Sequence, residues 1–258
     1  MALTGLMISC KKEVPEATNH NKQLADQLVM ATVWFQQSAE MEASYLQAYE
    51  WAKFLIDQKL DTLKKGSKTG VILDIDETVL DNSPYEVQLI RNGGQYGSAT
   101  WKAWTDQARA RALPGALDFV KYAQSKGVEV FYISNRREIE LEATLKNLDS
   151  LDFPNADTTH VLLMKDTGDK TARRAKVNKQ VQVILYVGDN LTDYSEAFAD
   201  READLGKNAI HSTKSKWLYE FVMLPNPMYG EWEKAVYDND YRLPDSVKVQ
   251  RRLTILQD

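Results

Sequence analysis

The chain of 258 residues is 43% hydrophobic, 27% charged and 10% aromatic, which is enough apolar material for the core of one large domain, with or without an insertion. Lys plus Arg number 32 and Asp plus Glu number 37, so the net charge of −5 gives no electrostatic basis for binding a nucleic-acid polymer. Basic residues cluster locally at 165–176, which keeps a small anionic ligand compatible with the composition.

The single cysteine, Cys10, excludes an internal disulfide and follows a short apolar run. This run, a small residue and then Cys10 resemble the end of a bacterial lipoprotein signal peptide, in which the cysteine carries the lipid. We therefore expect residues 1–21 to be a signal remnant and a polar tether. The alternative is an ordinary chain terminus, because short terminal apolar runs are weak signals. No later segment has the roughly 18 consecutive apolar residues of a membrane span.

Residues 22–65 contain neither Gly nor Pro, and their apolar positions recur at helical spacing. The pattern predicts two helices with a break near residues 38–43. Gly66 and Gly70 end this helical segment and lead into an apolar run. We expect the N-terminal helices of residues 22–69 to form part of a cap.

Strand-like and helix-like segments alternate from residue 70 to the end of the chain. Strands are predicted at residues 71–75, 128–133, 160–164 and 182–187, and helices at about 115–126, 137–149, 169–180, 230–238 and 246–256. This alternation predicts an α/β fold with a Rossmann-like parallel sheet flanked by helices. Residues 82–114 interrupt the alternation with several Gly, Trp and Tyr residues. They predict a small, mostly helical cap inserted into a core of residues 70–258.

Polar residues follow each of the four predicted strands. Asp74 and Asp76 stand one residue apart at the first strand end, so both face the same side if the chain stays extended. Carboxylates this close repel each other unless a proton or a cation intervenes. The polar residues after the later strands are Ser134 and Asn135, then Lys165, then Asp189 and Asp193. Because ligands bind at the carboxyl ends of parallel strands, the sequence predicts one site that collects all of them.

These residue types together fit the chemistry of a phosphate ester. One carboxylate can attack phosphorus, while a second protonates the departing alkoxide and then deprotonates water. Carboxylate oxygens bind Mg²⁺, and a hydroxyl, an amide and an ammonium bind the phosphate oxygens. Each feature alone has a simpler explanation: Ser134 and Asn135 as a helix cap, Lys165 as a solvated strand end, and Asp189 as part of a turn. Four such placements in the right order favour the joint site.

Four segments resemble the four motifs of the haloacid dehalogenase superfamily: DIDET at 74–78, Ser134-Asn135, Lys165, and GDNLTD at 188–193. More narrowly, residues 74–85 and 187–193 are similar to the class C bacterial acid phosphatases, and the likeness runs from about residue 22 to 232. The resemblance implies a Mg²⁺-dependent acid phosphatase that hydrolyses phosphomonoesters, including nucleoside monophosphates, through an aspartyl-phosphate. It also implies an outer-membrane lipoprotein of the bacterial cell envelope, anchored through Cys10, and a homodimer.

The resemblance assigns catalytic and metal-binding roles to the aspartates. Asp74 matches the nucleophile, and Asp76 matches the acid/base whose backbone carbonyl also ligates Mg²⁺. Asp74 and Asp189 match the carboxylate ligands of the metal, and Asp193 matches a residue that orients a metal-bound water.

The remaining motif residues match substrate-binding positions. Ser134, Asn135 and Lys165 match the phosphate-binding positions, with Lys170 or Arg173 as alternatives to Lys165. Trp101, Tyr229 and Tyr85 are expected in the substrate cap, where the first and second would sandwich a nucleotide base; ordinary packing is the alternative for each.

Two other functions are compatible with the same residues. A phosphotransferase or phosphomutase would use the same aspartyl-phosphate but pass the phosphoryl group to an alcohol. A non-catalytic binding or storage protein on the same fold is disfavoured because Asp74, Asp76, Asp189 and Asp193 are all present.

Overall fold

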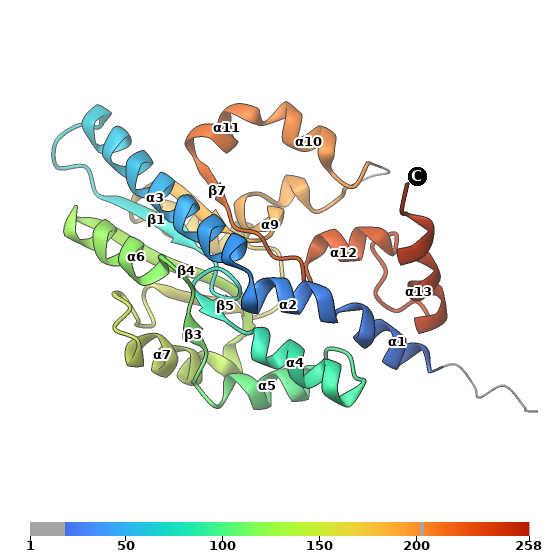
Figure 1. The fold of residues 1–258 in the computed structure, drawn as a ribbon. Coiled ribbons are helices and arrows are strands. Elements are labelled where there is room, and N and C mark those ends of the chain that lie inside the picture. The colour runs from blue at the N-terminus through green and yellow to red at the C-terminus, as the bar shows by residue number, and fades with distance from the viewer. Residues whose placement is uncertain (1–18, 202–203, 258) are drawn as a thin grey trace, which may run out of the picture.

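A computed structural model of the chain describes residues 19–201 and 204–257 (Figure 1). Cys10 and most of the predicted tether therefore lie outside the described residues. Within the described part, no helix combines the length and the apolar character needed to cross a bilayer.

A five-stranded sheet with the order β5-β4-β1-β6-β7 forms the centre of the molecule. Its strands are β1 (Thr69–Leu73), β4 (Val128–Arg137), β5 (Val161–Met164), β6 (Gln182–Gly188) and β7 (Phe221–Met223). All four strand pairs are parallel, which confirms the predicted fold class. β7 was not predicted, because a three-residue apolar segment carries too little periodicity.

The register of the sheet brings distant parts of the chain to one edge. Leu73, the last residue of β1, pairs with Tyr132 of β4 and Val187 of β6. The residues that follow these three paired positions therefore lie side by side at the carboxyl edge, where parallel sheets bind ligands.

Helices cover both faces of the sheet. α3 (Ala39–Thr62) and α6 (Ala116–Ser125) pack together on one face, and α8 (Thr171–Asn178) contacts β4 and β6 on the other. All of β1 is buried, and successive side chains face opposite sides of the sheet: Val71 and Leu73 belong to the core under α3, whereas Ile72 belongs to the core under α8. The 3-10 helix η1 (Glu138–Glu140) and α7 (Leu141–Ser150) join β4 to β5.

The N-terminal segment forms three helices rather than two: α1 (His20–Gln27), α2 (Val29–Gln37) and α3. The predicted break near residues 38–43 lies at Ser38, whose hydroxyl accepts a hydrogen bond from the N–H of Met41 and caps α3. α1 and α2 contact α4, but α3 packs on the sheet itself. The expectation that the whole segment belongs to a cap is therefore wrong for α3, whose buried Tyr45, Tyr49 and Ile56 belong to the main core.

The inserted segment contains α4 (Ser83–Asn92) and α5 (Ser98–Thr105), and it is tied to the core by the antiparallel pair β2 (Leu80–Asp81) and β3 (Arg111–Ala112). The other helices are α9 (Leu191–Tyr194), the 3-10 helix η2 (Glu196–Phe198), α10 (Lys207–Ser212), α11 (Lys214–Tyr219), α12 (Glu231–Val236) and α13 (Asp245–Thr254). α13 packs against α1, so the C-terminal part of the described chain closes against its N-terminal part (Figure 1).

Two tyrosines of α3 hold the loop that follows β1. The Tyr45 hydroxyl donates to the carbonyl of Glu77 at 2.5 Å, and the Tyr49 hydroxyl donates to the carbonyl of Thr78 at 2.6 Å. Both rings are fully buried. The helix thus fixes the backbone just after Asp74 and Asp76.

Replacing Tyr49 by Phe should lower the free energy of unfolding by about 1–3 kcal/mol, because the Thr78 carbonyl loses a buried hydrogen-bond donor. Urea denaturation measures this change. Tyr219→Phe is the matched control, since Tyr219 is 58% exposed; its effect should stay within about 0.5 kcal/mol. Equal effects of the two variants would contradict the anchoring role.

Candidate active site

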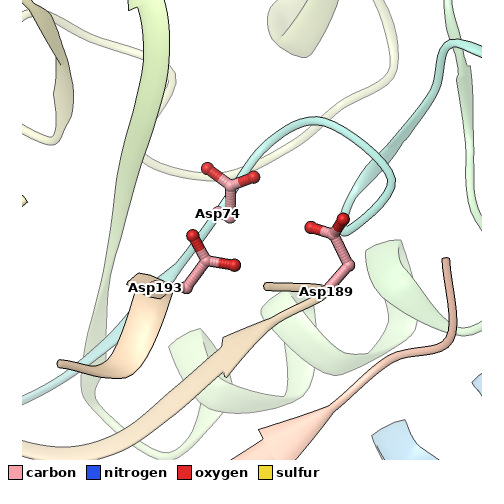
Figure 2. Close-up of side chains that lie close together, drawn as sticks. All are labelled: Asp74, Asp189 and Asp193. Atoms are coloured by element: carbon pink, nitrogen blue, oxygen red, sulfur yellow. The ribbon is translucent and has the colours of Figure 1, made fainter. Parts of the chain in front are cut away.

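Three aspartates meet at the carboxyl edge of the sheet. Oxygens of Asp74, Asp189 and Asp193 all lie within 4.8 Å of one another, and all three residues are buried. Figure 2 shows Asp74 on the segment after β1, and Asp189 and Asp193 on the segment after β6, with their carboxylates converging. The structure therefore brings these three predicted residues together.

The backbone positions each aspartate through short-range contacts. The N–H of Asp74 donates to the carbonyl of Val187 at 3.0 Å and extends the pairing of β1 with β6. The N–H of Asn190 donates to Asp193 Oδ2 at 2.8 Å, which caps α9. A Cβ on Gly188 would lie 2.4 Å from that same oxygen, so only glycine lets Asp193 approach the strand end.

Lys170 is the cation of the cluster. Its ammonium lies 2.5 Å from Asp74 Oδ1 and 2.7 Å from Asp193 Oδ1, and its side chain is 4% exposed. The expected phosphate-binding Lys165 is instead 69% exposed and pairs with Glu138 at 2.8 Å, so its assignment to the site is wrong. Lys165 directly follows the edge strand β5 and is exposed, whereas Lys170 lies five residues further along, at the N-cap of α8.

Burial and mutual repulsion shift the proton affinities of the carboxylates. Burial raises the pKa of Asp74 to about 7, with Asp193 and Asp76 adding to the increase and Lys170 opposing it. Burial, followed by repulsion from Asp193 and Asp74, raises the pKa of Asp189 well above its ordinary value. Burial alone would lower the pKa of Lys170, but Asp193 and Asp74 raise it, so the ammonium stays charged.

This donor set fits a divalent cation. If all three aspartates are ionised, Lys170 leaves two negative charges uncompensated in a buried place, and carboxylate oxygens are the ligands that Mg²⁺ prefers. Asp189 is oriented by the side-chain amide of Asn226 at 2.9 Å and the hydroxyl of Thr78 at 3.2 Å. Asp74 Oδ2 accepts no hydrogen bond from any described residue, which leaves it available to a ligand.

Asp76 lies beside this cluster rather than within it. Its carboxylate is paired with Arg136 at 2.8 Å and accepts hydrogen bonds from Asn82 at 2.8 Å and from the Ser134 hydroxyl at 3.1 Å. Arg136 is 2% exposed and also donates to Asn82 and Thr144. Asp74 and Asp76 therefore have different surroundings. Asp74 lies beside the ammonium of Lys170 and the other buried acids, whereas Asp76 is bound by the guanidinium of Arg136, the amide of Asn82 and the hydroxyl of Ser134.

The C-terminal part of β4 is held by a residue of α8. Arg173 donates to the carbonyl of Ser134 at 2.6 Å and to the side chain of Asn135 at 2.7 Å. Ser134 and Asn135 both line the pocket next to Asp74 and Asp76. The two predicted phosphate-binding residues thus lie at the site, and the hydrogen bonds from Arg173 hold them in place.

A cavity of about 650 Å³ opens from the aspartates toward the cap, a size that suits a small organic molecule. Trp101 and Tyr229 both line it, as expected for cap residues. Tyr85 does not: its ring is 1% exposed and packs edge-on against Trp101, so its assignment as a substrate contact is wrong. Tyr96, which is 66% exposed, lines the pocket instead of Tyr85.

Sequence reasoning missed several residues of the site. Arg136 directly follows the predicted pair Ser134-Asn135, so its position at a strand end was an available signal. No signal in the sequence pointed to Leu24 of α1 or Arg252 of α13. These two residues line the pocket only because α1 packs against α13. The backbone carbonyl of Asp76 stays a predicted metal ligand.

The similarity to known proteins agrees with this geometry. A family model described as HAD superfamily, subfamily IIIB (acid phosphatase), matches residues 6–232. The class C acid phosphatase from Bacillus anthracis is 38% identical, with a TM-score of 0.87 over 92% of this chain and 99% of that chain. A structure of the Bacillus anthracis class C acid phosphatase with tungstate bound is 37% identical, with the same TM-score and coverage.

Two plant proteins are more distant relatives. Acid phosphatase 1 of Solanum lycopersicum is 27% identical over 167 residues, and the stem 31 kDa glycoprotein of Glycine max is 26% identical over 167 residues. These alignments cover 61% of this chain but only 57% and 58% of the two relatives, so the chain spans little more than half of their length.

A parallel α/β sheet with buried aspartates and a lysine at its carboxyl edge defines the class of protein, which is the HAD type. Within this class, the chain belongs to subfamily IIIB, the acid phosphatase family. The similarity to class C acid phosphatases that the motifs predicted is confirmed.

A divalent cation such as Mg²⁺ should raise the melting temperature, because a cation held by the three aspartates of the folded site stabilises the folded chain over the unfolded one. Since burial raises the pKa of Asp74 to about 7, cation binding at pH 6 should displace a proton, and the apparent affinity should increase up to about pH 7 and then level off. Thermal-shift titrations at several pH values measure this dependence.

Asp189→Asn should weaken Mg²⁺ binding on the order of tenfold or more, because it removes a ligand charge. Asp166→Asn, at an exposed position in the loop after β5, is the control and should leave the titration unchanged. An equal shift in wild type and Asp189→Asn would contradict the metal site.

Proposed function

We propose that this chain is a Mg²⁺-dependent phosphomonoesterase in which Asp74 attacks phosphorus and forms an aspartyl-phosphate. The observation that carries the proposal is the setting of Asp74, which lines the pocket. Its Oδ1 accepts a hydrogen bond from Lys170, whereas its Oδ2 accepts none from a described residue. Membership of the acid phosphatase family supports it. The Bacillus anthracis relative with tungstate bound adds support, since tungstate, like phosphate, is an oxyanion.

Two displacements at phosphorus account for hydrolysis. In the first, an oxygen of Asp74 bonds to phosphorus, the bond to the leaving group breaks, and Asp76 gives its proton to the departing alkoxide. In the second, water bonds to phosphorus and loses a proton to Asp76, while the phosphorus–Asp74 bond breaks. The need for both forms of Asp76 in one cycle favours a mildly acidic optimum.

The other residues of the site bind and orient. Lys170 offsets the charge of Asp74 and can pair with a phosphoryl oxygen, while Ser134 and Asn135 supply polar groups at the same wall. Asp74, Asp189 and Asp193 would hold the cation, which supplies charge neutralisation for the carboxylates and the phosphoryl oxygens. Arg136 and Asn82 hold Asp76 in place for proton transfer.

The cap favours a leaving group that contains a ring. Tyr96, Trp101 and Tyr229 line the pocket that begins at Asp74, and aromatic side chains stack favourably on planar rings. Nucleoside monophosphates and aryl phosphates are therefore the proposed substrates.

The same proposal extends to the place where the protein acts. The apolar run before Cys10 supports lipidation of that cysteine and anchoring of the enzyme to the outer membrane of the cell envelope, as a monomer or a homodimer. Mass spectrometry of Cys10 in the membrane fraction tests the anchor, and a Cys10→Ala variant that stays in that fraction would contradict it. Light scattering measures the oligomeric state.

Asp74→Asn should lower kcat by on the order of 10⁴-fold or more, because the nucleophilic carboxylate is lost while the fold stays intact. Steady-state kinetics with phenyl phosphate measure the loss, and an unchanged circular dichroism spectrum controls for folding. Undiminished turnover by Asp74→Asn would refute the proposed mechanism.

Lys170→Met should reduce kcat/KM by about 10²–10³-fold, because the buried counter-charge of Asp74 and the phosphoryl oxygens is removed. Lys165→Met is the matched control in the same loop, and it should stay within about twofold because an exposed ion pair contributes little. The reverse order of the two effects would restore Lys165 as the phosphate-binding residue.

A further inference from the structure

The pocket extends well beyond the groups that handle phosphate. Besides the aspartates it is lined by apolar side chains: Leu24 of α1, Leu28 between α1 and α2, Leu89 of α4, and Met228. Figure 1 shows α1 beside α4 and α13, so this part of the pocket is built where the two ends of the described chain meet the cap.

Glu86 is the exception in this apolar wall. It lies in the first turn of α4, lines the pocket and is only 6% exposed. No residue among 19–201 and 204–257 forms a hydrogen bond or an ion pair with its carboxyl group. A buried carboxyl group without a partner is costly, because its desolvation is not offset.

Glu233, a second acid in the same pocket, shows how the protein satisfies a carboxylate here. Arg252 lies 2.6 Å from it, and the Tyr237 hydroxyl donates to it at 2.8 Å. Glu86 has no such donors among the described residues. Burial, followed by repulsion from Glu233, raises the pKa of Glu86 to about 8. Whether protonated or ionised, its carboxyl group can accept a hydrogen bond, and the open side of the group is the pocket.

We propose that Glu86 is a specificity-determining residue that accepts a hydrogen bond from an amino group on the ring of the leaving group. The inference rests on the proposed phosphomonoesterase function. The aromatic and apolar walls take the ring, and Glu86 supplies a buried carboxyl group in the apolar part of the pocket that accepts no hydrogen bond from a described residue. A buried acceptor of this kind discriminates against a ligand that lacks the matching donor, since binding then leaves the group unpaired.

The test compares two nucleotides that differ by one amino group: adenosine 5′-monophosphate and purine riboside 5′-monophosphate, both with Mg²⁺. Wild type should show a kcat/KM for the amino-bearing nucleotide about tenfold higher. Glu86→Leu should bring the ratio close to one, whereas Glu86→Gln, which keeps an acceptor oxygen, should retain most of the preference. Glu231→Gln removes a charge from the same pocket and should leave the ratio unchanged.

Phenyl phosphate separates failure of this inference from failure of the proposed function. It lacks the amino group, so its kcat/KM should be within about twofold of wild type in both Glu86 variants. If wild type hydrolyses none of the three esters, the proposed function is wrong. If it hydrolyses them without the tenfold preference, or if Glu86→Leu keeps that preference, the role of Glu86 alone is overturned.

Discussion

The ammonium of Lys170, shared between Asp74 and Asp193, is the interaction on which the site depends. It places one positive charge among three buried carboxylates, where burial, with a further contribution from Asp193 and Asp76, raises the pKa of Asp74 to about 7 and Lys170 opposes the increase. One cation is too few to neutralise the cluster, so the protein alone leaves the site short of positive charge. A divalent cation held by the three carboxylates would offset the two negative charges that remain.

Hydrogen bonds from the surrounding fold hold the segment that carries Asp74 and Asp76 in place. Tyr45 and Tyr49 of α3 fix the loop after β1 from the core side, and Arg136 with Asn82 fixes Asp76 from the other side. The two carboxylates that stand one residue apart in sequence are thereby given separate partners. The different roles proposed for them rest on these partners, because the two side chains are chemically identical.

Under the proposed function, the substrate is selected by a different part of the molecule. Asp74 and its neighbours lie at the sheet edge, whereas the distal wall of the pocket comes from α1, α4 and the C-terminal helices. The chemistry can therefore stay constant while changes at positions such as Glu86 and Tyr96 alter the leaving group that is accepted.

The sequence by itself determined the parallel sheet and three of the four aspartates in the cluster region, because strand periodicity and the position of acids after apolar runs are local properties. Asp74, Asp189 and Asp193 meet as predicted, since parallel strands end at one edge. Only the tertiary structure decided that Lys170 and not Lys165 reaches them, because a loop's path over the sheet does not follow from its residue types. It likewise buried Tyr85, exposed Tyr96 and left Glu86 without a hydrogen-bond partner in the described part of the chain, since those outcomes depend on how α1, α4 and α13 pack together.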